Sequence, residues 1–377
     1  TGQHLPIFTV VTDLGSGHCT WFDNRVEKMF IASEQIRSLA MKQGEVPDDK
    51  LIKAGLPIRY DFAIQAKCLG EYGRFSQHGQ KHQKQIRTKL GLLDKRTVLV
   101  AGGGEGVGSL STIVDALYKE LDSSRIDATV LVVCGRNISL KNELDTRIWK
   151  SMCKESTCKL NCQNNNIKLN QKDNINVDSM LSSQTSDDYQ IELEDEKKDD
   201  ILDKNLHSIS SENISSELSS NSFQSNQMHA CNSSQEYNVE VKALGYITNM
   251  AEYMVASDII VSKAGPGTIA EAAAVGLPVL LTSFLPGQEE GNVEFVVDNK
   301  FGEYEDHSNP KAIAEKVSAW FRDPKIMERM SVKAQTAGIP NAAEDIAKAI
   351  GCSVVRWKEL NEEDKPTANT SNLQNND

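Results

Sequence analysis

Short apolar, β-branched runs alternate with helical patterns along most of the chain, and this alternation is the strongest constraint on its fold. Each run leads into a loop, and most loops are followed by apolar residues at helical spacing. Such runs are typical of parallel strands buried on both faces, so the pattern predicts a doubly wound α/β fold. We expect strands at residues 7–12, 29–32, 51–54, 97–101, 129–134, 241–245, 259–262 and 279–282. Ser33 and Gly44 are expected to begin and end one helix, and residues 110–121 to form another.

One long segment departs from this alternation. Residues 151–240 contain sixteen acidic and seven basic side chains, thirty-seven Ser, Asn and Gln, three aromatic residues, and neither Gly nor Pro. Such a composition cannot bury enough apolar surface to offset the entropy of ordering the chain. We therefore predict a disordered insertion at 154–237, and a disordered tail of the same character at 361–377.

Composition also limits the possible partners and compartments. The net charge of −12 argues against general nucleic-acid binding. No apolar run approaches the ~20 residues of a membrane-spanning helix. The chain opens at Thr1 without Met or a signal sequence, so we expect it to begin inside a longer protein whose targeting peptide lies upstream. Cys153, Cys158 and Cys162 form either half of a metal site or free thiols of a reducing compartment, and free thiols are favoured.

The loop after the 259–262 strand carries the clearest chemical signal. It reads Lys263-Ala264-Gly265-Pro266-Gly267-Thr268 and opens a helix. Its glycines permit close approach of a ligand, the helix N-terminus presents amide groups and a positive dipole, and Lys263 adds a charge. These features suit a diphosphate, and Glu271 one turn later could accept hydrogen bonds from a ribose diol. The alternative is a Gly-Pro-Gly turn that caps a helix and needs no ligand.

Two further loops follow predicted strands. Residues 102–108 are glycine-rich but match neither the dinucleotide-binding nor the P-loop spacing, so they indicate only close approach of a sugar or phosphate. Residues 286–292 offer amide and carboxylate groups that suit the hydroxyls of a sugar, or else form a polar surface turn.

Near the start, His18 follows a predicted strand and is either a general base or a structural histidine. Trp21 and Phe22 either line an acyl-chain or glycerol-backbone site or belong to the core. Residues 67–96 are rich in Lys and Arg, which indicates a solvated linker and helix or, alternatively, a basic face for anionic lipid headgroups. No serine-hydrolase or zinc-protease motif is present in the sequence.

Taken together, the motifs resemble one family, the monogalactosyldiacylglycerol synthases of plastid envelopes, relatives of MurG in glycosyltransferase family 28. The segments that carry the resemblance, in chain order, are 12–14, 18–22, 55–59, 102–106, 134–137, 245–248, 263–272 and 287–292. The string 263–272 is the most specific of them.

The resemblance implies a GT-B fold, in which two Rossmann-like domains hold the active site between them, with the N-terminal domain truncated here. The implied division is 1–66, acceptor domain; 67–96, basic linker; 97–153 and 238–360, UDP-sugar-binding domain; 154–237, insertion; and 361–377, tail.

The resemblance also implies an inverting hexosyltransferase that needs no metal or cofactor. It would move galactose from UDP-galactose to the free hydroxyl of 1,2-diacylglycerol, bound peripherally to the plastid (chloroplast) envelope membrane. Contact with anionic lipids remains the alternative for residues 67–96, and the acidic composition predicts no nucleic-acid partner. The implied donor-site residues are Gly104, Glu105, Gly106, Arg136, Tyr246, Ile247, Met250, Lys263, Ala264, Gly265, Pro266, Gly267, Thr268, Glu271, Gly287, Gln288, Glu289 and Asn292. Of these, Gly265 to Thr268 would hold the diphosphate, Glu271 the ribose, Tyr246, Ile247 and Met250 the uracil, and Gln288 and Glu289 the galactose. Arg136 would lie near the phosphates, and His18, Trp21 and Phe22 on the acceptor side.

The chain departs from the family pattern in two places. The family's N-terminal Gly-Gly-Gly-His loop, whose His is the favoured catalytic base, is absent, and Cys19 stands where the family usually has Pro. Two alternatives follow: an inactive UDP-binding fragment of this enzyme, or a UDP-N-acetylglucosamine 2-epimerase-like enzyme of the same architecture.

Overall fold

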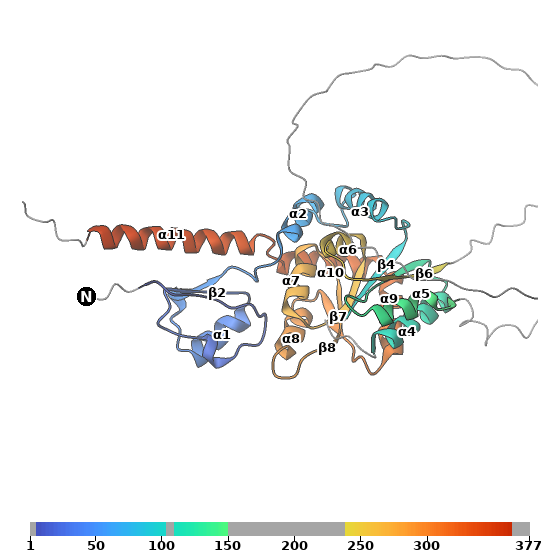
Figure 1. The fold of residues 1–377 in the computed structure, drawn as a ribbon, viewed down its shortest axis with the longest axis horizontal. Coiled ribbons are helices and arrows are strands. Elements are labelled where there is room, and N and C mark those ends of the chain that lie inside the picture. The colour runs from blue at the N-terminus through green and yellow to red at the C-terminus, as the bar shows by residue number, and fades with distance from the viewer. Residues whose placement is uncertain (1–4, 103–108, 150–237, 364–377) are drawn as a thin grey trace, which may run out of the picture. The chain divides into compact units, whose positions relative to one another are not determined.

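The computed structural model describes residues 5–102, 109–149 and 238–363, and within them it contains two parallel β-sheets (Figure 1). The predicted insertion and most of the predicted tail lie outside the described residues. The described parts of residues 1–158 and 235–377 belong to one unit. The predicted α/β class is confirmed, with one Rossmann-like sheet in each of the two parts expected of a GT-B chain.

The smaller sheet is formed by the N-terminal residues. Its strands are β1 (Phe8–Val10), β2 (Lys28–Ile31) and β3 (Leu51–Lys53), paired in parallel in that order. Helix α1 (Glu34–Gln43) begins and ends as predicted: the Ser33 hydroxyl accepts a hydrogen bond from the Ile36 amide, and Gly44 closes the last turn. The apolar face of α1 packs on this sheet around Met29, Ile31 and Ile36.

The larger sheet has six parallel strands in the order β6-β5-β4-β7-β8-β9. Their bounds are β4 (Arg96–Ala101), β5 (Ala128–Val133), β6 (Val239–Leu244), β7 (Ile259–Lys263), β8 (Val279–Ser283) and β9 (Gly302–Tyr304). The chain builds outward from β4 to β6, then crosses to the other side of β4 and continues from β7 to β9. The order therefore reverses between β4 and β7, where open α/β sheets have their ligand crevice.

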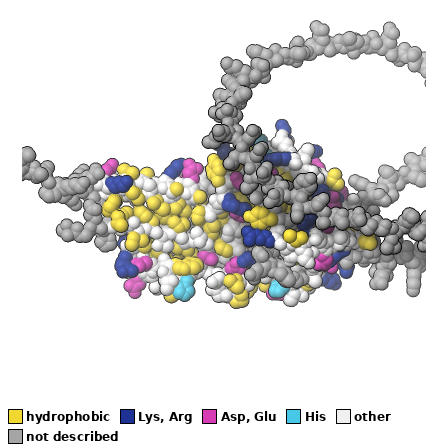
Figure 2. All heavy atoms as spheres, viewed as in Figure 1, with side chains coloured by type: hydrophobic (Ala, Val, Ile, Leu, Met, Phe, Trp, Pro, Cys, Tyr) yellow, Lys and Arg dark blue, Asp and Glu magenta, His cyan; other side chains and the backbone are white. Residues whose placement is uncertain are grey.

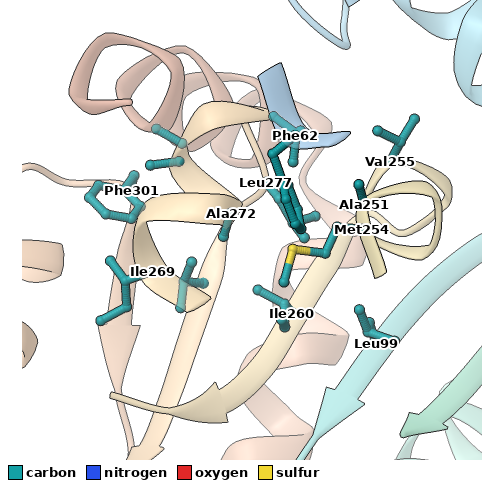
Figure 3. Packing of buried hydrophobic residues seen from close by; sticks show 14 of the residues in the cluster. Phe62, Leu99, Ala251, Met254, Val255, Ile260, Ile269, Ala272, Leu277 and Phe301 are labelled. Carbon is teal, nitrogen blue, oxygen red and sulfur yellow. The ribbon is translucent and has the colours of Figure 1, made fainter. Parts of the chain in front are cut away.

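Helices cover both faces of this sheet. They are α2 (Tyr60–Leu69), α3 (Gln77–Lys89), α4 (Ser109–Ser123), α5 (Ile138–Thr146), α6 (Met250–Ala256), α7 (Pro266–Ala274), α8 (Glu290–Asp298), α9 (Pro310–Arg322) and α10 (Pro324–Ala337). A long helix, α11 (Ala342–Glu363), follows them in the sequence. Successive residues of β4 point to opposite sides, so Leu99 packs with α6 and α7 whereas Val98 and Val100 pack with α4 and α9. Figure 3 shows the first of these cores, where Leu99 and Ile260 lie beneath Met254 and Ala272.

Helix α2 shows where the chain passes from the smaller sheet to the larger. Phe62 of this helix is buried in the core of the larger sheet, against α6 and α7 (Figure 3), and Leu69 belongs to the same core. Residues 60–66, predicted as part of the acceptor domain, thus pack with the helices of the larger sheet, and the predicted division at 66 stays a prediction. The apolar residues of α2 would suit either core, so local sequence could not assign the helix to one of them.

The predicted basic linker, 67–96, contains α3 and is bound to the larger sheet by buried arginines. Arg74 donates to the main-chain oxygens of Met254, Ser257 and Val275. Arg87 donates to the oxygen of Ala256 and pairs with Asp94 and Asp258. Two of the basic side chains of this segment, Arg74 and Arg87, therefore hold it against the helices of the larger sheet. On the face drawn in Figure 2, basic and acidic side chains are interspersed.

None of the helices within the described ranges is both long enough and apolar enough to cross a bilayer.

Candidate functional site

The candidate site is built from loops at the carboxyl edge of the larger sheet, on both sides of the crossover between β4 and β7. The loop after β4 contains the predicted residues Gly104, Glu105 and Gly106, which lie outside the described residues. The loops after β5, β6, β7 and β8 are described, and these loops, the end of β7 and the helices α6, α7 and α8 carry the remaining donor-site predictions. Parallel strands bring these loops, distant in sequence, to one edge.

The loop after β7 leads into α7 through residues that leave the helix N-terminus open. Gly265 is the N-cap and makes no side-chain capping bond, and Pro266 occupies the first turn. The first amides of a helix lack intrahelical acceptors, and the helix dipole gives this end a partial positive charge. Because no side chain caps this end, an anionic ligand can take that place.

The glycines of this loop are not explained by the fold. A Cβ atom at Gly267 would meet nothing within 4 Å, and one at Gly265 would make only ordinary contacts of 3.7–3.9 Å. Neither residue has a positive φ, in contrast to Gly276 at φ +63°. Neither packing nor backbone geometry requires glycine here, so the turn leaves room for a ligand to approach its backbone closely.

Lys263, at the end of β7, faces Glu289 across the site. Its Nζ lies 2.7 Å from Glu289 Oε1, and the other oxygen of Glu289 accepts a hydrogen bond of 2.9 Å from the Leu285 amide. The Lys263 side chain is 45% exposed, whereas that of Glu289 is 10% exposed. The structure thus brings together a cation predicted to meet phosphate and a carboxylate predicted to meet the sugar. The adjacent Gln288 and Gly287 are exposed, and Gly287 has φ +77°.

Glu271 forms an ion pair that was not predicted. Both of its carboxylate oxygens accept from Arg59, at 2.7 Å from Nε and 2.9 Å from Nη2. The Glu271 side chain is only 11% exposed. These hydrogen bonds and the neighbouring negative charge raise the pKa of Arg59. Arg59 lay inside a motif noted in the sequence, but its partner is 212 residues away, so only the fold reveals the pair.

Tyr246 and Arg136 lie on the loops after β6 and β5. The Arg136 guanidinium carbon is 5.9 Å from the centre of the Tyr246 ring, and Tyr246 is 70% exposed. An exposed ring beside an arginine can stack with a nucleobase. Ile247 and Met250, predicted to share this role, are half-buried, and Met250 packs against the core beneath.

Asn292 joins the site to the N-terminal sheet. It is fully buried; its amide donates to the oxygen of Ala264, and its side-chain oxygen accepts from the amides of Leu14 and Gly15. The backbones approach so closely that a Cβ on Gly15 would lie 1.9 Å from the Gly291 oxygen. Asn292 therefore holds two loops together, and its predicted role in donor binding stays a prediction.

The residues predicted on the acceptor side are placed differently from one another. His18 is exposed and caps a short turn, with Nδ1 2.8 Å from Thr20 Oγ1, and its role as a general base stays a prediction. Phe22 is buried in the core of the smaller sheet, so the core alternative holds for this residue. Trp21 is 45% exposed and is the one of the aromatic pair that remains open to solvent.

In the described part of the chain, no three His, Cys, Asp or Glu side chains are grouped to hold a metal ion. Cys19, Cys68, Cys134 and Cys352 are free thiols. Cys153, Cys158 and Cys162 lie outside the described residues.

Comparison with known proteins points to glycosyltransferases. Residues 210–350 match the glycosyltransferase family 28 C-terminal domain. Monogalactosyldiacylglycerol synthase 3, chloroplastic, of Arabidopsis thaliana is 28% identical over 92% of this chain and 56% of its own length. A probable monogalactosyldiacylglycerol synthase, chloroplastic, of Glycine max is 29% identical over 89% of this chain and 44% of its own length. The chain thus spans about half the length of these curated relatives.

Among solved structures, MurG of Acinetobacter baumannii aligns with a TM-score of 0.44 at 13% identity, over 86% of this chain and 66% of that one. WaaG, a glycosyltransferase involved in lipopolysaccharide biosynthesis, aligns with a TM-score of 0.43 at 12% identity, over 87% and 64%. The curated homologues of this chain are thus monogalactosyldiacylglycerol synthases, and its residues 210–350 match the glycosyltransferase family 28 C-terminal domain.

Proposed function

We propose that this chain binds UDP-galactose at the carboxyl edge of the larger sheet and transfers galactose to 1,2-diacylglycerol. The observation that carries the proposal is the open N-terminus of α7 at the strand-order reversal, with two glycines that the fold does not require. The homologues support a transferase of the monogalactosyldiacylglycerol synthase type. The donor sugar, the lipid acceptor and inversion at the anomeric carbon are part of the proposal.

In this mechanism the diphosphate lies against the first amides of α7. As the bond to the sugar breaks, negative charge grows on the leaving UDP, and the helix dipole together with Lys263 stabilises it. Lys263 must then share its charge between Glu289 and the phosphates, since its Nζ lies 2.7 Å from Glu289 Oε1. We infer that this arrangement needs no metal ion.

The remaining donor contacts follow from the positions of the side chains. Tyr246 is exposed and can stack with uracil, with Arg136 beside it toward the phosphates. Glu271 is placed to accept from the ribose, and Gln288 and Glu289 from the galactose hydroxyls. Trp21 faces solvent on the acceptor side, and His18 is the candidate base within this chain. The homologues are named chloroplastic, which supports a plastid location, where we propose peripheral contact with the envelope membrane.

Isothermal titration of UDP in the presence of EDTA tests the donor site. Micromolar binding is expected, unchanged when Mg²⁺ replaces EDTA, and Lys263→Ala should weaken it. Lys300→Ala, at an exposed residue of the turn after α8, is the matched control. Absence of binding by protein that shows a cooperative melting transition would refute the site.

A transfer assay then tests the substrates. The chain is incubated with vesicles containing diacylglycerol and with UDP-galactose, UDP-glucose or UDP-N-acetylglucosamine. Galactolipid from UDP-galactose alone is the expected product. Glucolipid would correct the donor, and isomerised UDP-N-acetylglucosamine without lipid would favour the epimerase alternative.

A further inference from the structure

Arg59 and Glu271 join the segment that follows β3 to α7, the helix of the candidate site. The guanidinium meets the carboxylate in a two-pronged arrangement, at 2.7 and 2.9 Å, and lies 5.1 Å from the centre of the Phe62 ring. Phe62 is 1% exposed, so the arginine rests on a fixed surface. Such a planar, two-pronged pair fixes orientation as well as charge.

The pair does not use the full capacity of the carboxylate. An ionised carboxylate offers about four acceptor positions, and Arg59 occupies one on each oxygen. One position on each oxygen remains, which is the number that two neighbouring hydroxyls of a ribose require. Because Glu271 is 11% exposed, little freedom remains for it to turn toward a ligand by itself.

Removal of Arg59 would therefore change what Glu271 presents. A nearly buried carboxylate without its partner is costly, so it would rotate toward water. It would then no longer offer two fixed acceptors. The orientation of Glu271 therefore depends on Arg59.

We propose that Arg59 is a positioning residue that holds Glu271 ready to accept hydrogen bonds from both ribose hydroxyls, and so sets the preference of the site for ribonucleotides. This inference rests on the proposed donor site. In this proposal Arg59 acts through the ribose, so its effect on binding is the same with and without phosphates on the ligand. A direct contact between Arg59 and the diphosphate would instead affect only ligands that carry phosphates.

Titration calorimetry with UDP, uridine and 2′-deoxy-UDP tests the proposal. The parent chain is expected to bind UDP about tenfold more tightly than 2′-deoxy-UDP, the size of one hydrogen bond to a charged group. Arg59→Gln should weaken the binding of UDP and of uridine by the same factor. The ratio of the affinities for UDP and 2′-deoxy-UDP should fall close to one. In the Glu271→Gln background, Arg59→Gln should have no further effect on that preference.

Two controls keep the experiment decisive. Arg25→Gln removes an arginine whose two-pronged partner, Asp23, lies on the surface of the N-terminal part, and it should leave all three affinities unchanged. If Arg59→Gln melts below the assay temperature, Arg59→Lys keeps the charge without the two-pronged donor and should still reduce the preference.

The outcomes separate this inference from the proposed function. An unchanged preference in the Arg59 variants would overturn it, and so would a parent chain that does not distinguish UDP from 2′-deoxy-UDP. Loss of UDP affinity with unchanged uridine affinity would place Arg59 on the diphosphate instead. If the parent binds none of the three ligands, it is the proposed donor site that fails.

Discussion

At the scale of single residues, Asn292 is the clearest case of a side chain that serves the fold within the candidate site. It satisfies the oxygen of Ala264 and the amides of Leu14 and Gly15, all through one buried amide group. Asn292→Ala leaves these groups without partners, so we expect it to lower the free energy of unfolding by about 2–4 kcal/mol. Urea denaturation measures the change.

Asn299→Ala is the matched control for Asn292. Asn299 ends α8, is exposed, and donates only to the Phe295 oxygen, so its loss should cost less than about 1 kcal/mol. Equal effects of the two substitutions would show that the contact between the loops contributes nothing to stability.

Asp13 gives the molecule a pH dependence of known sign. Burial raises the pKa of this carboxyl above 3.8, although the amides of Gly15 and Ser16 donate to it and act in the opposite direction. Above the raised pKa the ionised group therefore reduces stability, and this cost disappears as the pH falls through that pKa toward 3.8. Asp13→Asn keeps an acceptor for both amides, so we expect the variant to be more stable than the parent at pH 7 and equal to it at low pH.

Asp306→Asn should change the stability at pH 7 in the opposite direction to Asp13→Asn. Hydrogen bonds from Ser308 and Tyr304 hold the pKa of this exposed carboxyl at about 2. The stability that Asp306 contributes is present above pH 3.8 and is lost as the pH falls through about 2. Unfolding curves measured from pH 7 to about 2 compare the variants with the parent, and an Asp13→Asn curve that runs parallel to the parent would contradict the argument.

At the scale of elements, the strands and α1 could be read from local sequence. Apolar runs located β4, β5, β7 and β8 to within a residue or two, and Ser33 and Gly44 marked the ends of α1, because these signals are local. The three-residue strand β9, Gly302–Tyr304, was missed because its sequence lacks an apolar run.

Contacts between distant segments could not be predicted in the same way. The pairing of Arg59 with Glu271 and the bonds of Asn292 to Leu14 depend on the arrangement of whole elements. Sequence reasoning therefore found the loops of the candidate site but not the side chains that hold them.

A substitution of Gly267 in α7 should affect stability and UDP binding in opposite directions. Since a Cβ there meets nothing within 4 Å, Gly267→Ala should leave the fold intact and raise the free energy of unfolding by up to about 1 kcal/mol. The added methyl group would occupy the space assigned to the diphosphate, so UDP affinity should fall about tenfold or more. Calorimetry and urea denaturation on one sample separate the two effects.

Gly351→Ala is the control for this helix argument. Gly351 lies within α11, and a Cβ there also meets nothing within 4 Å. The gain in stability should be similar, with no change in UDP affinity. An unchanged affinity in Gly267→Ala would mean that no ligand approaches this turn closely.

At the scale of the whole molecule, the larger sheet is assembled from two parts of the sequence separated by the segment 154–237. Strands β5 and β6 nonetheless pair in parallel along their full lengths, from Ala128 with Val239 to Val133 with Leu244. A parallel pair of strands requires a crossover connection, and α5, which packs against β6, supplies a helix for it before the segment 154–237 begins. All described candidate residues lie outside it as well.

We therefore expect a chain in which a short Gly-Ser linker replaces 154–237 to fold and to bind UDP as the parent does. The melting temperature and the calorimetric affinity are the measurements, made side by side on the two proteins. A second replacement, of 138–146, removes α5 itself and should abolish the cooperative transition, because Leu140 and Leu144 belong to the core. Loss of that transition in the first variant would show that the segment contributes to the folded state, whereas retained melting with lost UDP binding would place part of the donor site within it.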